Sequence, residues 1–209
     1  AFAAAAAHAQ ELIAEHGYTY IPPFDDIDVV AGQGTIGVEI LRQHSGRLDA
    51  VFVPVGGGGL IAGVAAYIKY LRPEVKVIGV ESEDSASFKA ALDAGERVVL
   101  DQVGVFAEGV AVAQAGEVPF AIARDLIDEI ITVNADEMCA AVKDIFEDTR
   151  AVAETSGALS LAGLKKYIQR DGAEGETLLC INSGANTNFD RLQHIAERTE
   201  LGEQREAIL

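Results

Sequence analysis

Residues 50–71 read AVFVPVGGGGLIAGVAAYIKYL, and the prediction of the fold starts from this stretch. Residues 50–55 form an apolar, β-branched run typical of a buried strand, and residues 61–71 have the length and apolar content of a helix. Between them lie Gly56, Gly57, Gly58, Gly59 and Leu60, which we call the glycine turn. Glycine tolerates positive φ and close approach to the main chain. Because the following helix begins with unpaired N–H groups and the positive end of its dipole, the turn is expected to bind an anion, most often a phosphate.

Strands and helices alternate along the rest of the chain. A second apolar run, residues 75–80, follows the helix, so strand, helix and strand predict a right-handed parallel crossover. The other expected helices are residues 2–16, 36–44, 85–94, 118–126, 136–150, 156–168 and 189–198, and the other expected extended segments are residues 18–21, 98–100, 130–133 and 178–181. This pattern predicts an α/β fold, a three-layer sandwich with a mainly parallel sheet. A domain boundary is expected near Asp25, between residues 1–24 and residues 25–209.

Composition restricts the partners that the chain can have. The net charge is -17 and the 16 Lys and Arg residues are scattered, whereas binding to nucleic acid needs clustered basic side chains. No apolar run reaches the roughly 20 residues that a membrane span needs, and the amino end lacks the basic region of a secretory signal. Cys139 and Cys180 fall in a helical and a strand pattern, which suits buried thiols in a reducing compartment. A soluble, cytoplasmic protein is expected.

A second strand end also carries a polar group. Ser183 and Gly184 follow the expected strand at residues 178–181, and ligands of α/β sheets bind at the carboxyl ends of the strands. The commoner role of a serine in this position is to cap the next helix. Sequence spacing alone leaves both roles open.

Two kinds of phosphate ligand fit these residues. Gly57, Gly59 and Ala62 match the G-x-G-x-x-A spacing of a dinucleotide-binding turn, and Glu81 follows about 20 residues later, where a ribose-binding acid would stand. Alternatively, the glycines hold the single phosphate of a cofactor whose ring lies toward Ser183, and pyridoxal phosphate fits that description.

Six motifs in order make the chain recognisable. They are PPFD at 22–25, AGQGT at 31–35, GGGGL at 56–60, FAEGV at 106–110, ETSGA at 154–158 and SGAN at 183–186. Together they resemble the fold type II pyridoxal-phosphate enzymes. Within these, ELGEQRE at 200–206 and the overall spacing are similar to the biosynthetic threonine dehydratases. The resemblance covers the whole chain.

The resemblance implies roles for particular residues. The backbone N–H groups of the glycine turn would hold the phosphate of pyridoxal 5'-phosphate, and the Ser183 hydroxyl would meet its pyridine nitrogen. Glu154 faces the cofactor region in the family, but Thr155 replaces the family's proline, so Glu154 is only a candidate. The implied activity is deamination of L-threonine, or of L-serine, to the 2-oxo acid and ammonia in isoleucine biosynthesis, by an allosteric homo-oligomer. An inactive phosphate- or cofactor-binding fragment and a dinucleotide-binding domain remain alternatives.

Two departures from the family pattern change the expectation. The family's Schiff-base lysine lies in an S-x-K-x-R-G-like motif, and none of the six lysines here has that context; they are Lys69, Lys76, Lys89, Lys143, Lys165 and Lys166. The chain is therefore expected to be a fragment without that lysine and without the regulatory domain, inactive by itself, with residues 1–24 as the last helix and strand of the small domain. Relatives that bind a divalent cation pair the carboxylate at Glu81 with another six residues on, where Ser87 stands. No metal is expected.

Overall fold

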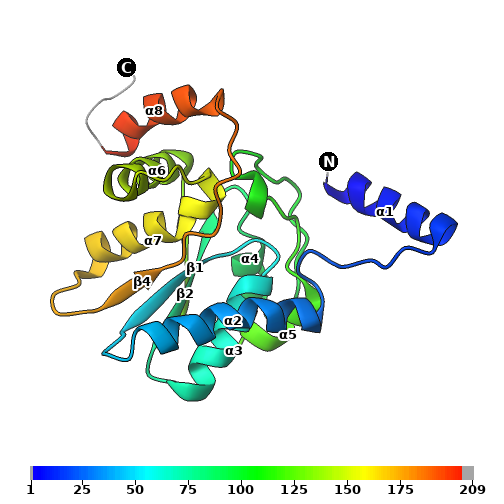
Figure 1. Ribbon diagram of the computed structural model, residues 1–209, viewed down its shortest axis with the longest axis horizontal. Helices are drawn as coiled ribbons and strands as arrows, with labels where there is room; N and C mark the ends of the chain where they lie inside the picture. The colour runs from blue at the N-terminus through cyan, green and yellow to red at the C-terminus, as the bar shows by residue number, and fades with distance from the viewer. Residues whose placement is uncertain (1, 204–209) are drawn as a thin grey trace.

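Four parallel strands form the centre of the protein. The computed structural model describes residues 2–203, in which the strands are β1 (Ala50–Pro54), β2 (Lys76–Ser82), β3 (Glu129–Val133) and β4 (Leu178–Cys180). Their spatial order is β3-β2-β1-β4 (Figure 1). All five residues of β1 are buried, and Phe52 pairs with Ile78 of β2 on one side and Cys180 of β4 on the other. β1 is thus a central strand, as its unbroken apolar sequence predicts.

Helices cover both faces of this sheet. The helices of the described residues are α1 (Phe2–His16), α2 (Ile27–Gln43), α3 (Gly59–Leu71), α4 (Ser87–Ala94), α5 (Glu117–Ala123), α6 (Ala135–Thr149), α7 (Thr155–Asp171), α8 (Arg191–Gly202) and a short 3-10 helix η1 (Glu108–Val110). Phe52 and Ile78 pack with α6 and α7, whereas Val51 and Val53 point the other way and pack with α3 and α5. The predicted three-layer α/β sandwich is confirmed.

The start of α2 differs from the prediction. The helix begins at Ile27, because the Asp26 carboxylate caps it by accepting hydrogen bonds from the N–H groups of Asp28 (2.8 Å) and Val29 (3.3 Å). Gly32 and Gly34 therefore lie inside the helix, whereas the sequence pattern predicts that they precede it. Asp26, three residues before the apolar pair 29–30, is the signal in the sequence for this start.

Two predicted extended segments do not form strands. In the described chain, residues 18–21 and 98–100 lie outside the sheet. Tyr18 and Ile21 are 61% and 75% exposed, so their β-forming side chains have no neighbouring strand to pack against. These two predictions are wrong for the described structure.

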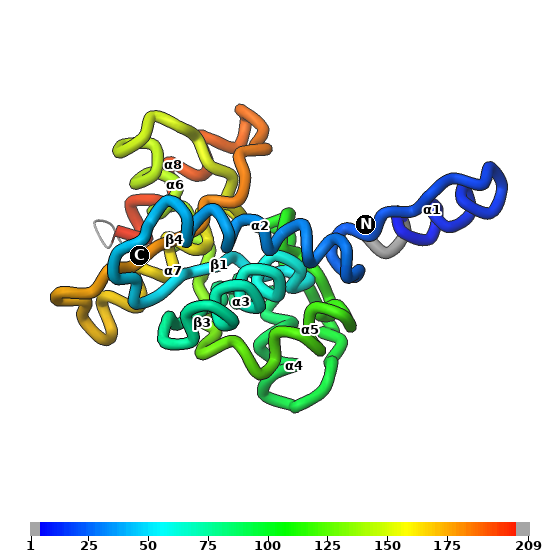
Figure 2. Tube along the Cα trace, turned by 60° about the horizontal axis from the view of Figure 1, so that its bottom comes forward, coloured from blue at the N-terminus to red at the C-terminus, as the bar shows by residue number. Residues whose placement is uncertain are grey.

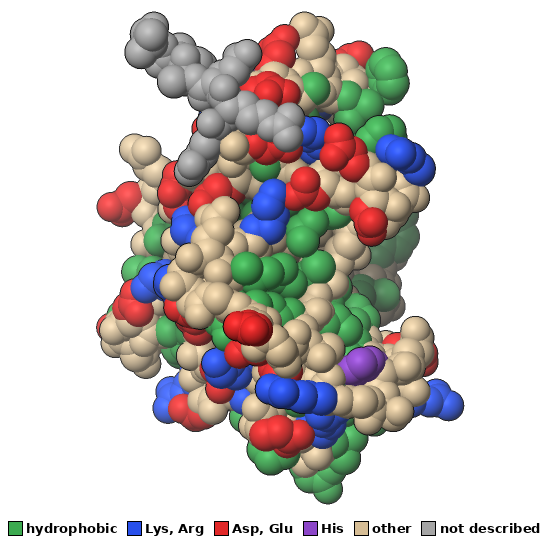
Figure 3. All heavy atoms as spheres, turned by 90° about the vertical axis from the view of Figure 1, so that its left-hand side faces the viewer, with side chains coloured by type: hydrophobic (Ala, Val, Ile, Leu, Met, Phe, Trp, Pro, Cys, Tyr) green, Lys and Arg blue, Asp and Glu red, His purple; other side chains and the backbone are tan. Residues whose placement is uncertain are grey.

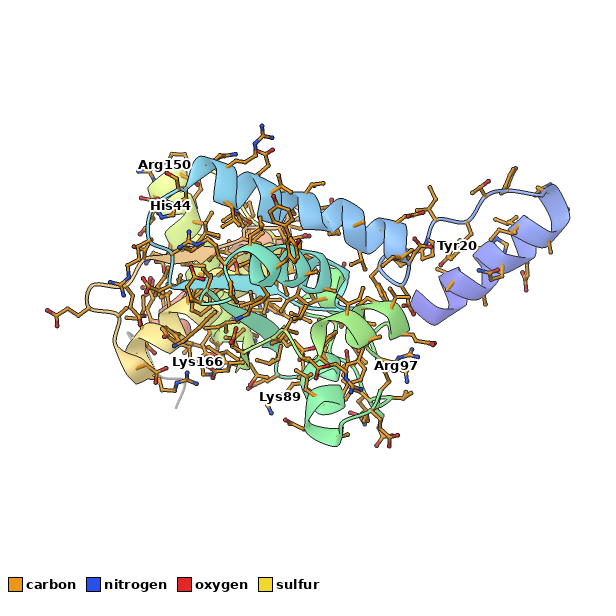
Figure 4. All side chains as sticks on the ribbon, turned by 90° about the horizontal axis from the view of Figure 1, so that it is seen from below. Tyr20, His44, Lys89, Arg97, Arg150 and Lys166 are labelled. Atoms are coloured by element: carbon orange, nitrogen blue, oxygen red, sulfur yellow. The ribbon has the colours of Figure 1, made fainter. Side chains whose placement is uncertain are left out.

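Helix α1 projects to one side of the sandwich. Figures 1 and 2 show it separated from the sheet and from the other helices, and Tyr20 lies on the segment that joins it to α2 (Figure 4). Division into residues 1–24 and 25–209 agrees with this shape but stays a prediction. The last residues of the ELGEQRE motif, Gln204 to Glu206, lie outside the described residues.

The surface mixes charges of both signs. On the face shown in Figure 3, basic and acidic side chains are interspersed. No helix in the described residues is long and apolar enough to cross a membrane. Cys139 in α6 is buried and Cys180 in β4 is partly buried, and neither forms a disulfide.

Helices α2 and α3 cross closely because glycines meet at the contact. A Cβ added to Gly63 of α3 would lie 2.3 Å from the Val30 carbonyl oxygen and 2.5 Å from the Gly34 nitrogen of α2. Backbone atoms cannot move aside as a side chain can. The helices can therefore pack at this distance only with glycine at position 63.

We expect Gly63→Ala to lower the free energy of unfolding by about 3 kcal/mol, because the new methyl group would force the helices apart. Gly32→Ala is the matched control: Gly32 lies in α2 with no atom within 4 Å of the added Cβ, so alanine there should stabilise the protein by about 0.5–1 kcal/mol. Urea unfolding of both variants measures the difference. Equal effects of the two substitutions would contradict the packing argument.

Candidate active site

The carboxyl ends of β1 and β4 lie next to each other where the order of the strands reverses. The chain passes from β1 to β2 and β3 on one side and returns to place β4 on the other. Such a switch point is where α/β sheets bind ligands. A pocket of about 400 Å³ opens there, between the glycine turn and Ser183. Its other lining residues are Pro23, Phe24, Gln33, Pro54, Glu108, Gly109, Val110, Ala111 and Val112.

The glycine turn presents unpaired N–H groups to this pocket. Gly58 precedes α3 in the left-handed region, with φ of 95°, and no side chain caps the helix. Within the described residues, the amides of residues 56–60 donate no hydrogen bond to the protein. The first turn of α3 therefore meets the pocket with its donors and the positive end of its dipole, which favours an anion.

Neighbouring side chains also require the glycines. An added Cβ would lie 2.3 Å from the Phe24 ring at Gly57, 2.3 Å from the Phe88 ring at Gly58 and 3.0 Å from the Val110 Cα at Gly56. The turn is thus held between three segments that are far apart in the sequence. Phe24 and Val110 lie in the PPFD and FAEGV motifs, but nothing in the sequence pattern indicates that they bound the glycine turn.

Ser183 follows β4 and lines the same pocket. The next helix, α8, begins at Arg191 and is preceded by Asp190, so Ser183 does not cap it. The alternative role of Ser183 as a helix cap is therefore wrong. In the described residues the hydroxyl forms no hydrogen bond to the protein, and Ser183 is exposed toward the pocket. The structure brings Ser183 and the glycine turn into one pocket.

The start of α7 holds the segment after Ser183. The Gly184 carbonyl accepts a hydrogen bond of 3.1 Å from the Glu154 N–H, and a Cβ on Gly157 would lie 2.3 Å from that same carbonyl oxygen. The Gly157 carbonyl in turn accepts a long hydrogen bond, 3.4 Å, from the Ser183 N–H. Backbone contacts therefore fix the position of Ser183 without using its hydroxyl.

Glu154 lines a different cavity from the glycine turn. This smaller cavity, about 160 Å³, lies between η1, the start of α7 and α8, and Glu108 borders both cavities. Burial, and secondarily the nearby Glu108 carboxylate, raise the pKa of Glu154. Glu108 itself forms an ion pair with Arg191 of α8. The structure thus places the candidate Glu154 behind Gly184 rather than in the pocket of the glycine turn.

Glu81 has a structural role that excludes the dinucleotide alternative. Its side chain is fully buried at the end of β2, and its two oxygens accept 2.8 Å hydrogen bonds from the N–H groups of Phe88 and Lys89. A ribose cannot reach this carboxylate. A cation does not fit either, because both oxygens already face the positive end of α4. Among the described residues no cluster of three or more metal-ligating side chains exists.

No lysine lines the pocket in the described part of the chain. Each of the six pairs with a group elsewhere: Lys69 with Asp128, Lys76 with Tyr167, Lys89 with Asp93, Lys143 with Glu203, Lys165 with Asp144 and Lys166 with Glu137. Figure 4 shows Lys89 on α4 and Lys166 on α7. A group that binds covalently through a lysine would therefore need a residue other than these six.

Comparison with known proteins identifies the family of this fold and pocket. The family model described as "Pyridoxal-phosphate dependent enzyme" matches residues 1–184. The chain belongs to this family. The cofactor of the family, pyridoxal phosphate, carries one phosphate and a ring with one nitrogen, which agrees with a pocket lined both by the start of an uncapped helix and by a serine hydroxyl.

Within the pyridoxal-phosphate dependent enzymes, the chain is similar to threonine dehydratases. It is 59% identical over 208 residues to the L-threonine dehydratase biosynthetic IlvA of Escherichia coli, covering 100% of this chain and 40% of that protein. It is 53% identical to the chloroplastic biosynthetic threonine dehydratase of Arabidopsis thaliana, covering 98% of this chain and 35% of that one. The processed threonine deaminase isoform 2 of Solanum lycopersicum superposes with a TM-score of 0.89 at 47% identity, over 92% of this chain and 56% of that structure. The chain therefore spans about two fifths of the length of the curated bacterial relative.

We expect the buried Glu81 to make stability depend on pH. Burial raises its pKa from 4.5 to about 7, and the hydrogen bonds from Phe88 and Lys89 only partly oppose this. The folded chain then holds the proton more tightly than the unfolded chain, so the free energy of unfolding falls as pH rises from about 4.5 to about 7. The loss should amount to roughly 3 kcal/mol.

The matching variant is Glu81→Gln, which keeps the shape of the side chain but cannot titrate. Urea unfolding at about pH 5 and about pH 8 should show a smaller loss of stability in the variant than in the native chain. Parallel pH profiles of the two proteins would contradict the assignment of this titration to Glu81.

Proposed function

We propose that this chain is the cofactor-binding part of a pyridoxal-phosphate dependent threonine ammonia-lyase, which converts L-threonine to 2-oxobutanoate and ammonia. L-Serine, which also carries a β-hydroxyl, is the second substrate that we propose. The observation that supports this most strongly is the pairing of an uncapped glycine turn with the Ser183 hydroxyl at adjacent strand ends. Similarity to threonine dehydratases over the whole chain supports L-threonine as the substrate.

The donors of the glycine turn fit a phosphate. Residues 56–60 offer unpaired N–H groups, and the lack of side chains leaves the main chain open to the pocket. We assign these five residues to the phosphate of the cofactor. The single carboxylate that lines the pocket, Glu108, is paired with Arg191, so its repulsion of an anion is reduced.

Ser183 fits the ring nitrogen at the other end of the cofactor. When bound, pyridoxal phosphate withdraws electrons from the α-carbon of an amino acid. A serine hydroxyl donates a hydrogen bond to the nitrogen but, unlike a carboxylate, does not stabilise a proton there. This weaker withdrawal favours loss of the β-hydroxyl over transamination. The fixed backbone at Gly184 and Gly157 would keep Ser183 at a constant distance from the glycine turn.

Further assignments follow from the same proposal. Residues 1–24 would belong to a small domain and residues 25–209 to the large, cofactor-binding domain. The whole protein would act in isoleucine biosynthesis, under allosteric control, as a homo-oligomer. Two cysteines without a disulfide fit a reducing compartment, and we propose the cytoplasm.

A second candidate function is cofactor or phosphate binding without catalysis. It is supported by the absence of a lysine among the described residues that line the pocket. Catalysis by the family's chemistry requires a group that holds the cofactor and moves a proton. For the 209-residue chain alone we therefore expect binding but no turnover.

Titration with two ligands tests the binding site. Inorganic phosphate and pyridoxal phosphate should both shift the amide resonances of residues 56–60, because both carry the anion that the α3 terminus favours. Ser183→Ala should weaken the binding of pyridoxal phosphate by about three- to tenfold, because one hydrogen bond is lost. The affinity for inorganic phosphate should not change.

Ser45→Ala is the control, since Ser45 lies on the surface before β1 and lines none of these cavities. It should bind both ligands as the native chain does. If no amide of the glycine turn responds to either ligand, the phosphate assignment is wrong. If Ser183→Ala lowers the affinity for both ligands equally, the assignment of Ser183 to the ring nitrogen is wrong.

A chimera tests the activity. We expect that replacing the matching 208 residues of the E. coli relative by this chain preserves formation of 2-oxobutanoate from L-threonine, whereas the 209-residue chain alone forms none. The same chimera with Gly58→Val should lose activity, because a β-branched residue resists the φ of 95° and would clash with Phe88. A folded, cofactor-loaded chimera that does not deaminate threonine would refute the proposed reaction.

A further inference from the structure

Helix α4 is capped by a strand rather than by its own first residues. The residue before the helix, Ala86, has no side-chain acceptor, and no side chain at that position caps the helix. Glu81 of β2 takes this role, since its Oε1 accepts from the Phe88 N–H and its Oε2 from the Lys89 N–H. The carboxylate is 0% exposed, so no water competes for these bonds. The first turn of α4 is therefore fixed relative to the sheet.

The side chain held in this first turn touches the glycine turn. Phe88 is 0% exposed, and a Cβ added to Gly58 would lie 2.3 Å from its Cε2 and 3.1 Å from the Cβ of Pro119. Phe88 also meets Phe120 of α5 edge to face, with ring centroids 5.8 Å apart, and Figure 2 shows α4 and α5 as neighbours. Phe88 thus forms the wall behind the residue that precedes α3.

Neither Glu81 nor Phe88 lines the pocket. Any effect that they have on a ligand must pass through the backbone of the glycine turn. Four successive glycines have large conformational freedom, and fixing them in one conformation costs entropy. A ligand that had to order the turn would bind more weakly than one that met it already ordered.

We propose that Phe88, held in place by Glu81, is a positioning residue that orders the glycine turn for anion binding. This inference rests on the proposed phosphate site. Phe24 bounds the turn at Gly57 and Gly59, and Phe88 bounds it at Gly58 from the side of α4. With both rings present, the N–H groups of the turn keep one direction before any anion arrives.

A matched pair of substitutions tests the proposal in the 209-residue chain. Phe88→Leu and Phe120→Leu remove the same atoms from the same aromatic pair, but only Phe88 abuts Gly58. Urea unfolding measures the stability of each variant, and amide-shift titration with inorganic phosphate measures its affinity. We expect phosphate to bind about tenfold more weakly to Phe88→Leu than to the native chain. The affinity of Phe120→Leu for phosphate should stay within about twofold of the native value.

Each outcome has a distinct meaning. If the native chain does not bind phosphate, the proposed phosphate site itself fails. If the native chain binds and Phe88→Leu binds equally well, or if both variants weaken to the same degree, the positioning role is refuted. Should Phe88→Leu not fold, Glu81→Gln decides, because its amide group turns a donor toward one of the two N–H groups of α4. About threefold weaker phosphate binding by that variant supports the inference, and native affinity overturns it.

Discussion

The unpaired amides of residues 56–60 are the constraint on which the rest of the structure depends. Backbone donors that meet no acceptor are unfavourable unless water or a ligand reaches them, so the turn must remain at an open pocket. Its place is set by β1, whose five buried residues leave no freedom to shift the strand along its neighbours. The rings of Phe24 and Phe88 then hold the turn on two sides. A flexible sequence thereby becomes a rigid set of donors.

Much of this arrangement could be predicted because it depends on local patterns in the sequence. The alternation of strands and helices, the glycine turn and the position of Ser183 after the last strand follow from periodicity and from the rule that ligands bind at strand ends. Several of the failed predictions concern interactions between distant segments. Glu81 stands at the spacing of a ribose-binding acid, and only the packing of α4 against β2 reveals that its oxygens are already used. Residues 18–21 have β-forming side chains, but a strand also needs a neighbour.

Glycine has three different uses in this chain, and sequence alone does not separate them. Position 58 has a positive φ, which favours glycine, and position 63 lies too close to the backbone of α2 for a side chain. Gly32 lies in a helix with space around it. The sequence predicts that residues 32–35 precede the helix, and glycine does weaken a helix in general. In the folded chain Gly34 lies opposite Gly63, so the cost within the helix is offset by the close crossing of α2 and α3. Helix propensity depends only on the local sequence, so it does not include the favourable packing of α2 against α3.

At the end of β4, as at the end of β1, backbone contacts fix the position of a group that is free to bind a ligand. The contacts of Gly184 with Glu154 and Gly157 hold this segment, and the Ser183 hydroxyl takes no part in them. A Ser183 hydroxyl tied to the protein would have to break a hydrogen bond before it could meet a ligand. The Glu154 carboxyl lines instead the second cavity, where burial and Glu108 raise its pKa. Apart from the Glu108 carboxylate, which is paired with Arg191, the pocket thus offers N–H dipoles at one strand end and a hydroxyl at the next, which is the complement of an anionic group attached to a weakly basic ring.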